Sequence, residues 1–144
     1  MDTNIIQIPD IESVPQFLNL LTPHFKCLFL FDARQIGTDK IDQAMNILLN
    51  QGMVYLCAWG PDCGRVHDIV DEITVMNEID KGVQGTIMTT WHDSDSLEEA
   101  SEFFRDLACC DDYFSSTFGS GVVIVVNNPQ WRQQVEALLI QSQS

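Results

Sequence analysis

The sequence predicts an α/β fold in which helices cover both faces of a mainly parallel sheet of four or five strands. This is a three-layer α/β/α arrangement, flavodoxin-like in class. The first observation behind it is that short, almost continuously apolar segments alternate with longer amphipathic ones. Continuous apolar runs are typical of strands buried on both faces, whereas apolar residues three and four positions apart indicate a helix with one buried side. The second observation is that the connections are short, which favours parallel strands joined by helices.

Four short segments have the composition of strands, because they are rich in β-branched residues, Leu and aromatic residues. Three of them are nearly all apolar, which places them in the centre of the sheet. The segment 4–8 is predicted as a fifth strand at an edge. The four predicted strands are residues 27–31, 53–58, 86–90 and 122–126.

Four longer segments have helical spacing of apolar residues, and a shorter helix is expected near residues 13–21, before the first central strand. Two starts are clearly signalled. Ser96 with Glu99 fits a capping box, and Asn128 before Pro129 fits an N-cap followed by proline at the first helical position. The four predicted helices are residues 39–51, 62–78, 97–109 and 129–141.

The length of 144 residues suits one domain, so residues 1–144 are predicted to form a single α/β domain. No apolar run reaches the roughly 18 residues that a membrane helix needs, and the first residues lack the basic and apolar regions of a signal peptide. The five cysteines do not have the spacing of a disulfide framework. We therefore expect a reduced, cytoplasmic protein that does not bind membranes.

The chain is strongly acidic, with 21 Asp and Glu against 7 Lys and Arg and a formal net charge of −14. This charge argues against nucleic acid as a partner, because binding to phosphates depends on Lys and Arg. Residues 62–112 hold 14 acidic and 3 basic residues, a net charge of −11. The carboxylates of the two helices in this segment avoid the apolar stripes and are predicted to face solvent. The predicted acidic docking face consists of Asp68, Asp71, Glu72, Glu98, Glu99 and Glu102.

This acidic face has two interpretations. One is solubility alone, since a charge run is usually a solvated surface. The other is a docking surface for a basic protein, because complementary charge speeds association and sets specificity.

A candidate ligand or partner site lies where the loops follow the strands, because open parallel sheets bind ligands beyond the carboxyl ends of their strands. The four loops are residues 32–38, 59–65, 91–96 and 127–131. They and the start of helix 62–78 hold most of the unusual side chains of the chain. The candidate site residues are Trp59, Asp62, Cys63, His67, Trp91, His92 and Asp93.

Phosphate binding has weak support. No Gly-rich phosphate loop is present, and in the nearest approach, residues 59–64, Pro61 removes an amide and Asp62 adds a negative charge. A nucleotide cofactor is therefore not expected.

A metal site and a cysteine nucleophile have similarly weak support. Cys63, His67 and Asp71 are four residues apart on one helix edge, so they fit zinc, but no C-x-x-C or H-E-x-x-H motif accompanies them. Cys63 lies near a helix start that would stabilise its thiolate, with His67 or His92 as base, but the neighbouring Asp62 opposes a lowered thiol pKa. The alternative is a half-buried cysteine, a His67–Asp71 pair and an exposed loop histidine. No catalytic residue, metal or cofactor is assigned.

Three segments carry a resemblance to a known family. They are residues 55–68, which include Trp-Gly-Pro-Asp-Cys and Val66-His67-Asp68, residues 89–93 with Trp91-His92-Asp93, and the acidic start of the helix at 96–104. In these features the chain resembles a small bacterial family of unknown function. The resemblance implies where a site lies and implies no activity.

Two functions follow as hypotheses. The first is a non-enzymatic, acidic interaction module of the bacterial cytosol, of immunity or inhibitor type, that binds a basic protein. The second is a small enzyme or a ligand- or metal-binding domain that uses the Trp/Cys/His/Asp loop cluster. The absence of any strong catalytic motif favours the first. The sequence does not predict the oligomeric state.

Overall fold

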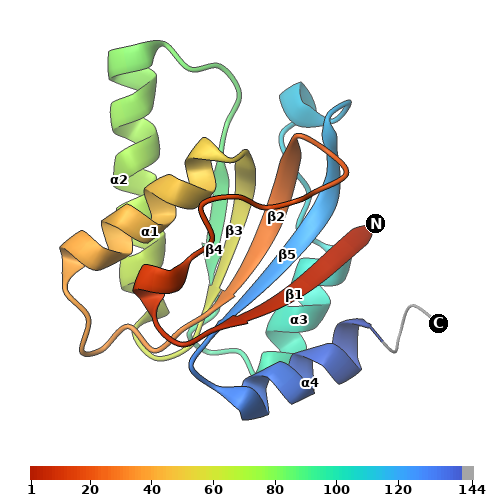
Figure 1. The fold of residues 1–144 in the computed structure, drawn as a ribbon. Helices are drawn as coiled ribbons and strands as arrows, with labels where there is room; N and C mark the ends of the chain where they lie inside the picture. Colours follow the sequence, from red (N-terminus) through yellow and green to blue (C-terminus); the bar gives the residue numbers. More distant parts are fainter. Residues whose placement is uncertain (141–144) are drawn as a thin grey trace.

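The computed structural model describes residues 1–140, which form one five-stranded, all-parallel sheet (Figure 1). The order of strands across the sheet is β1-β5-β2-β3-β4, so β1 and β4 are the edges. This confirms the α/β prediction and the edge position of the segment 4–8. The strands are β1 (Asp2–Ile8), β2 (His24–Leu30), β3 (Met53–Trp59), β4 (Met88–Trp91) and β5 (Phe118–Val126).

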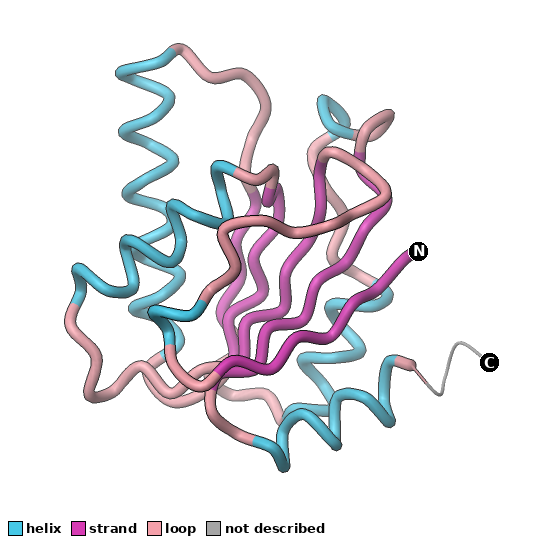
Figure 2. The backbone as a smooth tube through the Cα atoms, in the orientation of Figure 1, coloured by secondary structure: helices cyan, strands magenta, loops and turns pink. Residues whose placement is uncertain are grey.

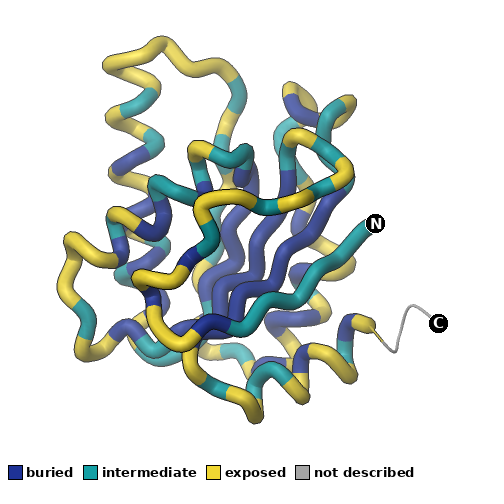
Figure 3. Tube along the Cα trace, in the orientation of Figure 1, coloured by how far each residue is buried: buried dark blue, intermediate teal, exposed yellow. Residues whose placement is uncertain are grey.

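Helices cover both faces of the sheet, which gives the predicted three layers (Figure 2). One face packs against α1 (Thr38–Asn50), α2 (Cys63–Lys81) and the 3-10 turn η1 (Ile11–Ser13). The other packs against α3 (Leu97–Asp106) and α4 (Pro129–Leu139). A second 3-10 turn, η2 (Asp112–Phe114), precedes β5. The central strands are buried on both sides, as their continuous apolar sequences predict (Figure 3).

Both predicted helix starts are confirmed. The Ser96 hydroxyl accepts the Glu99 N–H at 3.1 Å and the Glu99 carboxylate accepts the Ser96 N–H at 3.0 Å, which completes the capping box of α3. The Asn128 side chain accepts the Trp131 N–H at 3.1 Å, with Pro129 in the first turn of α4.

The helix predicted near residues 13–21 is wrong. After η1 the chain crosses the α1 face of the sheet as a loop (Figure 2). Pro15 lacks an N–H and disfavours helical backbone at Val14, which is why the apolar spacing does not produce a helix. The Gln51 side chain holds the loop instead, accepting the Leu18 N–H at 2.6 Å and donating to the Pro15 carbonyl at 2.8 Å.

Two helix ends differ by three residues from the predicted ones. Helix α2 continues three residues beyond 78, to Lys81, and ends at Gly82, whose φ of 60° is a left-handed cap. Helix α3 stops at Asp106 rather than 109, because the buried Lys26 ammonium of β2 donates to the carbonyls of Phe104 and Arg105. Helix α4 ends at Leu139, and the predicted end at residue 141 lies outside the described residues.

Within residues 1–140, no helix combines the length and apolarity that crossing a membrane requires. All five cysteines have free thiols.

Candidate functional site

Two hollows lie at the carboxyl edge of the sheet, which is the lower edge in Figure 1. The first, which we call the groove, has a volume of about 370 Å³ and lies between the loops that follow β3 and β4. Four of the seven candidate residues line it: Trp59, Asp62, His92 and Asp93. Cys63, His67 and Trp91 do not. Gly60, Pro61, Asp95 and Trp131 complete the lining.

His92 is buried, and both of its ring nitrogens have protein partners. Nδ1 lies 2.8 Å from the Asp95 carboxylate, and Nε2 lies 2.9 Å from the Thr90 hydroxyl. The ring packs on Phe103, with 4.8 Å between centroids. Asp93, by contrast, is exposed. His92 therefore holds the loop after β4 in place, and no lone pair or N–H of its ring is left for a ligand.

Trp59 is also committed to internal contacts. Its Nε1–H donates to the Asp95 carbonyl at 2.9 Å, and its ring meets Trp131 edge-to-face with centroids 4.9 Å apart. The indole thus joins the end of β3 to the loop before α3 and to the start of α4.

Cys63 begins α2 and is 1% exposed, in the core on the α1 face. Burial raises the pKa of its thiol, and the nearby carboxylates of Asp93 and Asp62 raise it further. A buried thiol held in its neutral form is a poor nucleophile. The geometry therefore does not support cysteine catalysis.

His67 and Trp91 lie together where α2 packs beside β4, and neither lines the groove. Their ring centroids are 4.3 Å apart. His67 Nδ1 is 3.0 Å from the Thr89 hydroxyl, and Nε2 is 3.4 Å from the Asp71 carboxylate. Across residues 1–140 no group of three or more His, Cys, Asp or Glu side chains is arranged to hold a metal ion, so the zinc hypothesis lacks a ligand set.

The turn 59–64 is a packing turn rather than a phosphate cradle. Gly60 has a φ of 123°, and a Cβ there would lie 2.1 Å from the Phe31 carbonyl oxygen, so only glycine fits. The amides of Cys63 and Arg65 bond within the turn, to the carbonyls of Gly60 and Asp62. Asp62 takes a left-handed φ of 63° at the start of α2.

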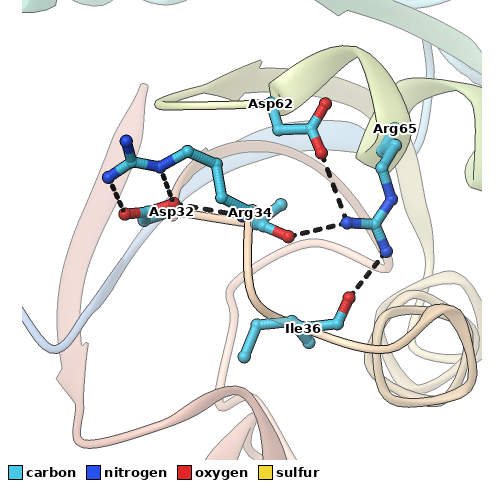
Figure 4. Close-up of polar contacts among 6 residues, drawn as sticks. Asp32, Arg34, Ile36, Asp62 and Arg65 are labelled. Carbon is cyan, nitrogen blue, oxygen red and sulfur yellow. Dashed lines mark hydrogen bonds and ion pairs between the residues drawn. The ribbon is translucent and has the colours of Figure 1, made fainter.

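Arg65 is a positioning residue to which sequence reasoning gave no role (Figure 4). Its guanidinium donates to the carbonyl of Ala33 at 2.7 Å and to that of Ile36 at 2.6 Å. It also lies 3.3 Å from the Asp62 carboxylate. Through these contacts the start of α2 holds the shape of the loop between β2 and α1.

The second hollow, which we call the crevice, lies between the loops that follow β2 and β5 and has a volume of about 430 Å³. These strands are neighbours, but β2 leads into α1 on one face of the sheet and β5 leads into α4 on the other. Such a reversal is the topological switch point, where open α/β sheets bind ligands. The lining comes from residues 9–12, from Phe31, Asp32, Arg34, Ile36 and Lys40, from Pro61, and from Val126, Asn127, Asn128 and Trp131.

Two exposed ion pairs stand on the rim of the crevice. Arg34 donates to both oxygens of Asp32, at 3.0 and 2.8 Å, and this contact lowers the pKa of the Asp32 carboxyl (Figure 4). Lys40 lies 2.7 Å from Glu12. Sequence reasoning named both loops but placed no candidate residue here, because the strand order that brings them together is not readable from the sequence.

The six carboxylates of the predicted acidic face are all exposed. They do not form one face, however. Asp68, Asp71 and Glu72 lie on α2, whereas Glu98, Glu99 and Glu102 lie on α3, and the sheet separates the two helices. The charge is therefore divided between two surfaces.

Residues 3–142 match the model of a protein family described as a domain of unknown function, DUF7684. The chain belongs to the DUF7684 family. This agrees with the predicted membership of a family of unknown function, and the description of DUF7684 names no activity or partner. No curated protein and no solved structure is significantly similar to this DUF7684 chain.

Proposed function

We propose that this protein is a non-enzymatic interaction module of the bacterial cytosol that binds a basic protein through the outer surface of α2. The observation that carries the proposal is a stripe of exposed side chains along that helix. Their spacing of three and four residues places them on one side. We call this set the outer stripe: Asp68, Asp71, Glu72, Val75, Met76 and Ile79.

The carboxyl half of the outer stripe is apolar, although it faces solvent. Val75, Met76 and Ile79 are 52%, 50% and 72% exposed. Helix α2 runs beyond the short strand β4, so its last turns have no strand beneath them and Met76 is exposed (Figures 1 and 3). Contiguous exposed apolar side chains are typical of an interaction surface.

The amino half of the outer stripe is acidic and has few cations to neutralise it. Asp68 and Asp71 approach the ring of His67, at 3.9 and 3.4 Å, and within residues 1–140 no ion pair involves Glu72. An apolar patch beside unneutralised carboxylates fits a partner with an apolar anchor and a basic surface around it. The acidic composition of the whole chain suits the same partner.

The test compares two double charge reversals of equal size. Asp68→Lys/Glu72→Lys alters the outer stripe, and Glu98→Lys/Glu102→Lys makes the same change, at the same spacing of four, on α3. Tagged wild type and both variants are used to capture proteins from a lysate of the source organism at low and high salt. We expect one stoichiometric basic protein with the wild type and the α3 variant, lost at high salt and lost with the α2 variant.

The purified partner then gives the association rate. The α2 variant is expected to associate about tenfold or more slowly at low salt, because steering by complementary charge is removed. Met76→Ser/Ile79→Ser is expected to speed dissociation instead. Equal effects of the two charge reversals, or no stoichiometric partner, would contradict the proposal.

The alternative function, a small enzyme or ligand site built from the seven loop residues, has less support. The polar atoms of Trp59 and His92 are bonded internally, and Cys63 is buried. His67 and Trp91 lie elsewhere, where α2 packs beside β4.

A further inference from the structure

The crevice differs from the rest of the surface in the charges that it gathers. Within a chain of net charge −14, its lining holds two of the seven Lys and Arg residues, Arg34 and Lys40. It also holds three carboxylates, those of Asp10, Glu12 and Asp32. Groups of both signs therefore face one hollow, at the switch point of the sheet.

The charged side chains of the crevice can bind a ligand with little loss of protein stability, because their ion pairs are exposed. The side chains of Arg34 and Asp32 are 64% and 42% exposed, and those of Lys40 and Glu12 are 54% and 61% exposed. Ion pairs this exposed add little to the stability of the protein. A ligand that replaces one partner of such a pair therefore gives up little binding free energy. Within residues 1–140 the Asp10 carboxylate forms no ion pair, and it accepts a hydrogen bond from the Ser13 hydroxyl at 3.0 Å.

The deeper lining is apolar. Phe31, directly after β2, and Val126, the last residue of β5, are buried, and Ile36 and Trp131 are half-buried beside them. A volume of about 430 Å³ is within the range of small-molecule sites.

We propose that the crevice binds a small zwitterion, a free α-amino acid with an apolar side chain. Its carboxylate pairs with Arg34 and Lys40, its ammonium pairs with the carboxylates of Asp10 and Asp32, and its side chain packs toward Phe31 and Trp131. A zwitterion offers a partner to the lining charges of both signs at once. A phosphate or another lone anion would meet three carboxylates, and a lone cation would meet Arg34 and Lys40.

The experiment is titration calorimetry of the purified protein with each common L-amino acid. We expect saturable binding of at least one apolar amino acid, such as leucine or phenylalanine. Two derivatives of that amino acid test the chemistry: the amine that lacks the carboxylate, and the N-acetyl acid that lacks the ammonium. Each is expected to bind about tenfold or more weakly, because one charged hydrogen bond is lost.

Variants then locate the site. Arg34→Gln and Asp32→Asn are each expected to weaken binding about tenfold. Arg105→Gln is the matched control. On α3, Arg105 donates two hydrogen bonds to the carboxylate of its neighbour Asp106, at 2.9 and 2.8 Å, as Arg34 does to Asp32. Amide chemical shifts of Asn127 and Asn128 are expected to move on binding.

No binding by any amino acid, derivatives that bind as well as the parent, or an equal loss in Arg105→Gln would each overturn the proposal. The partner proposal stands or falls separately, because the outer stripe of α2 shares no residue with the crevice.

Discussion

The groove and the crevice lie at the same edge of one sheet but use their polar side chains in opposite ways. In the groove, His92 and Trp59 form hydrogen bonds to Thr90 and Asp95, so their polar atoms stabilise the fold and are not free to bind a ligand. In the crevice, Arg34, Asp32 and Lys40 stand exposed in pairs that open easily. The groove holds the residue types usually associated with sites, Trp and His, whereas the crevice is where the topology of the sheet places a site.

Five substitutions, three of them with a matched control, test this difference, beginning with a residue in the turn between the two hollows. Gly60 lies in the turn of the groove and packs on the Phe31 carbonyl, at the base of the crevice. Gly60→Ala is expected to cost about 3 kcal/mol of unfolding free energy. The alanine Cβ would clash with the Phe31 carbonyl, and the backbone there has a positive φ that alanine disfavours. Urea unfolding measures this.

Gly82→Ala is the control for Gly60→Ala, since Gly82 also has a positive φ but nothing lies within 4 Å of its Cβ position. It is expected to cost only about 1 kcal/mol. Equal losses in the two variants would mean that contact with Phe31 is unimportant.

His92→Ala is expected to destabilise the protein by about 2–3 kcal/mol, because two hydrogen bonds and a ring contact are lost in a buried place. Asp93→Ala, one residue away and exposed, is expected to change the unfolding free energy by less than about 0.5 kcal/mol. If His92→Ala keeps full stability in urea, the histidine is free for function and the comparison of the two hollows fails.

Arg65→Met is expected to cost about 1–2 kcal/mol of unfolding free energy, since two backbone carbonyls of the loop between β2 and α1 lose a charged donor. Arg132→Met is the matched control, because within residues 1–140 the Arg132 side chain has only an exposed i,i+4 ion pair, with Glu136 at 3.5 Å, worth about 0–0.5 kcal/mol. Hydrogen exchange is expected to rise in residues 32–37 only in Arg65→Met. Unchanged exchange there would show that Arg65 does not hold the loop.

The smallest effects are expected on the rim of the crevice. Arg34→Gln and Lys40→Gln are expected to leave the melting temperature unchanged, since both pairs are exposed. The pKa of Asp32, which Arg34 lowers, is expected to rise toward the ordinary value of an aspartate in Arg34→Gln, as followed by NMR titration. Because the folded-state pKa is the lower one, the pair contributes stability only above the ordinary value and loses it as the pH falls. A large drop in melting temperature in either variant would show that these charges stabilise the fold and are not free to bind a ligand.

Much of the fold was determined by local sequence. The apolar run Val122–Val126 and the capping box of Ser96 and Glu99 depend on neighbours a few residues away, so they predict β5 and the start of α3 directly. The segment 4–8 was also predicted as an edge strand, and β1 lies at the edge of the sheet. These features need no knowledge of which strands are adjacent.

The rest was decided by contacts between distant parts of the chain. The order β1-β5-β2-β3-β4 placed the crevice between two loops almost a hundred residues apart, and it put the sheet between the acidic residues of α2 and α3. Likewise, only the short length of β4 left Met76 exposed, and only the fold gave His92 its two partners. Residue type and periodicity report the local environment, whereas a site requires groups from several strands, and their adjacency is set when the whole sheet assembles.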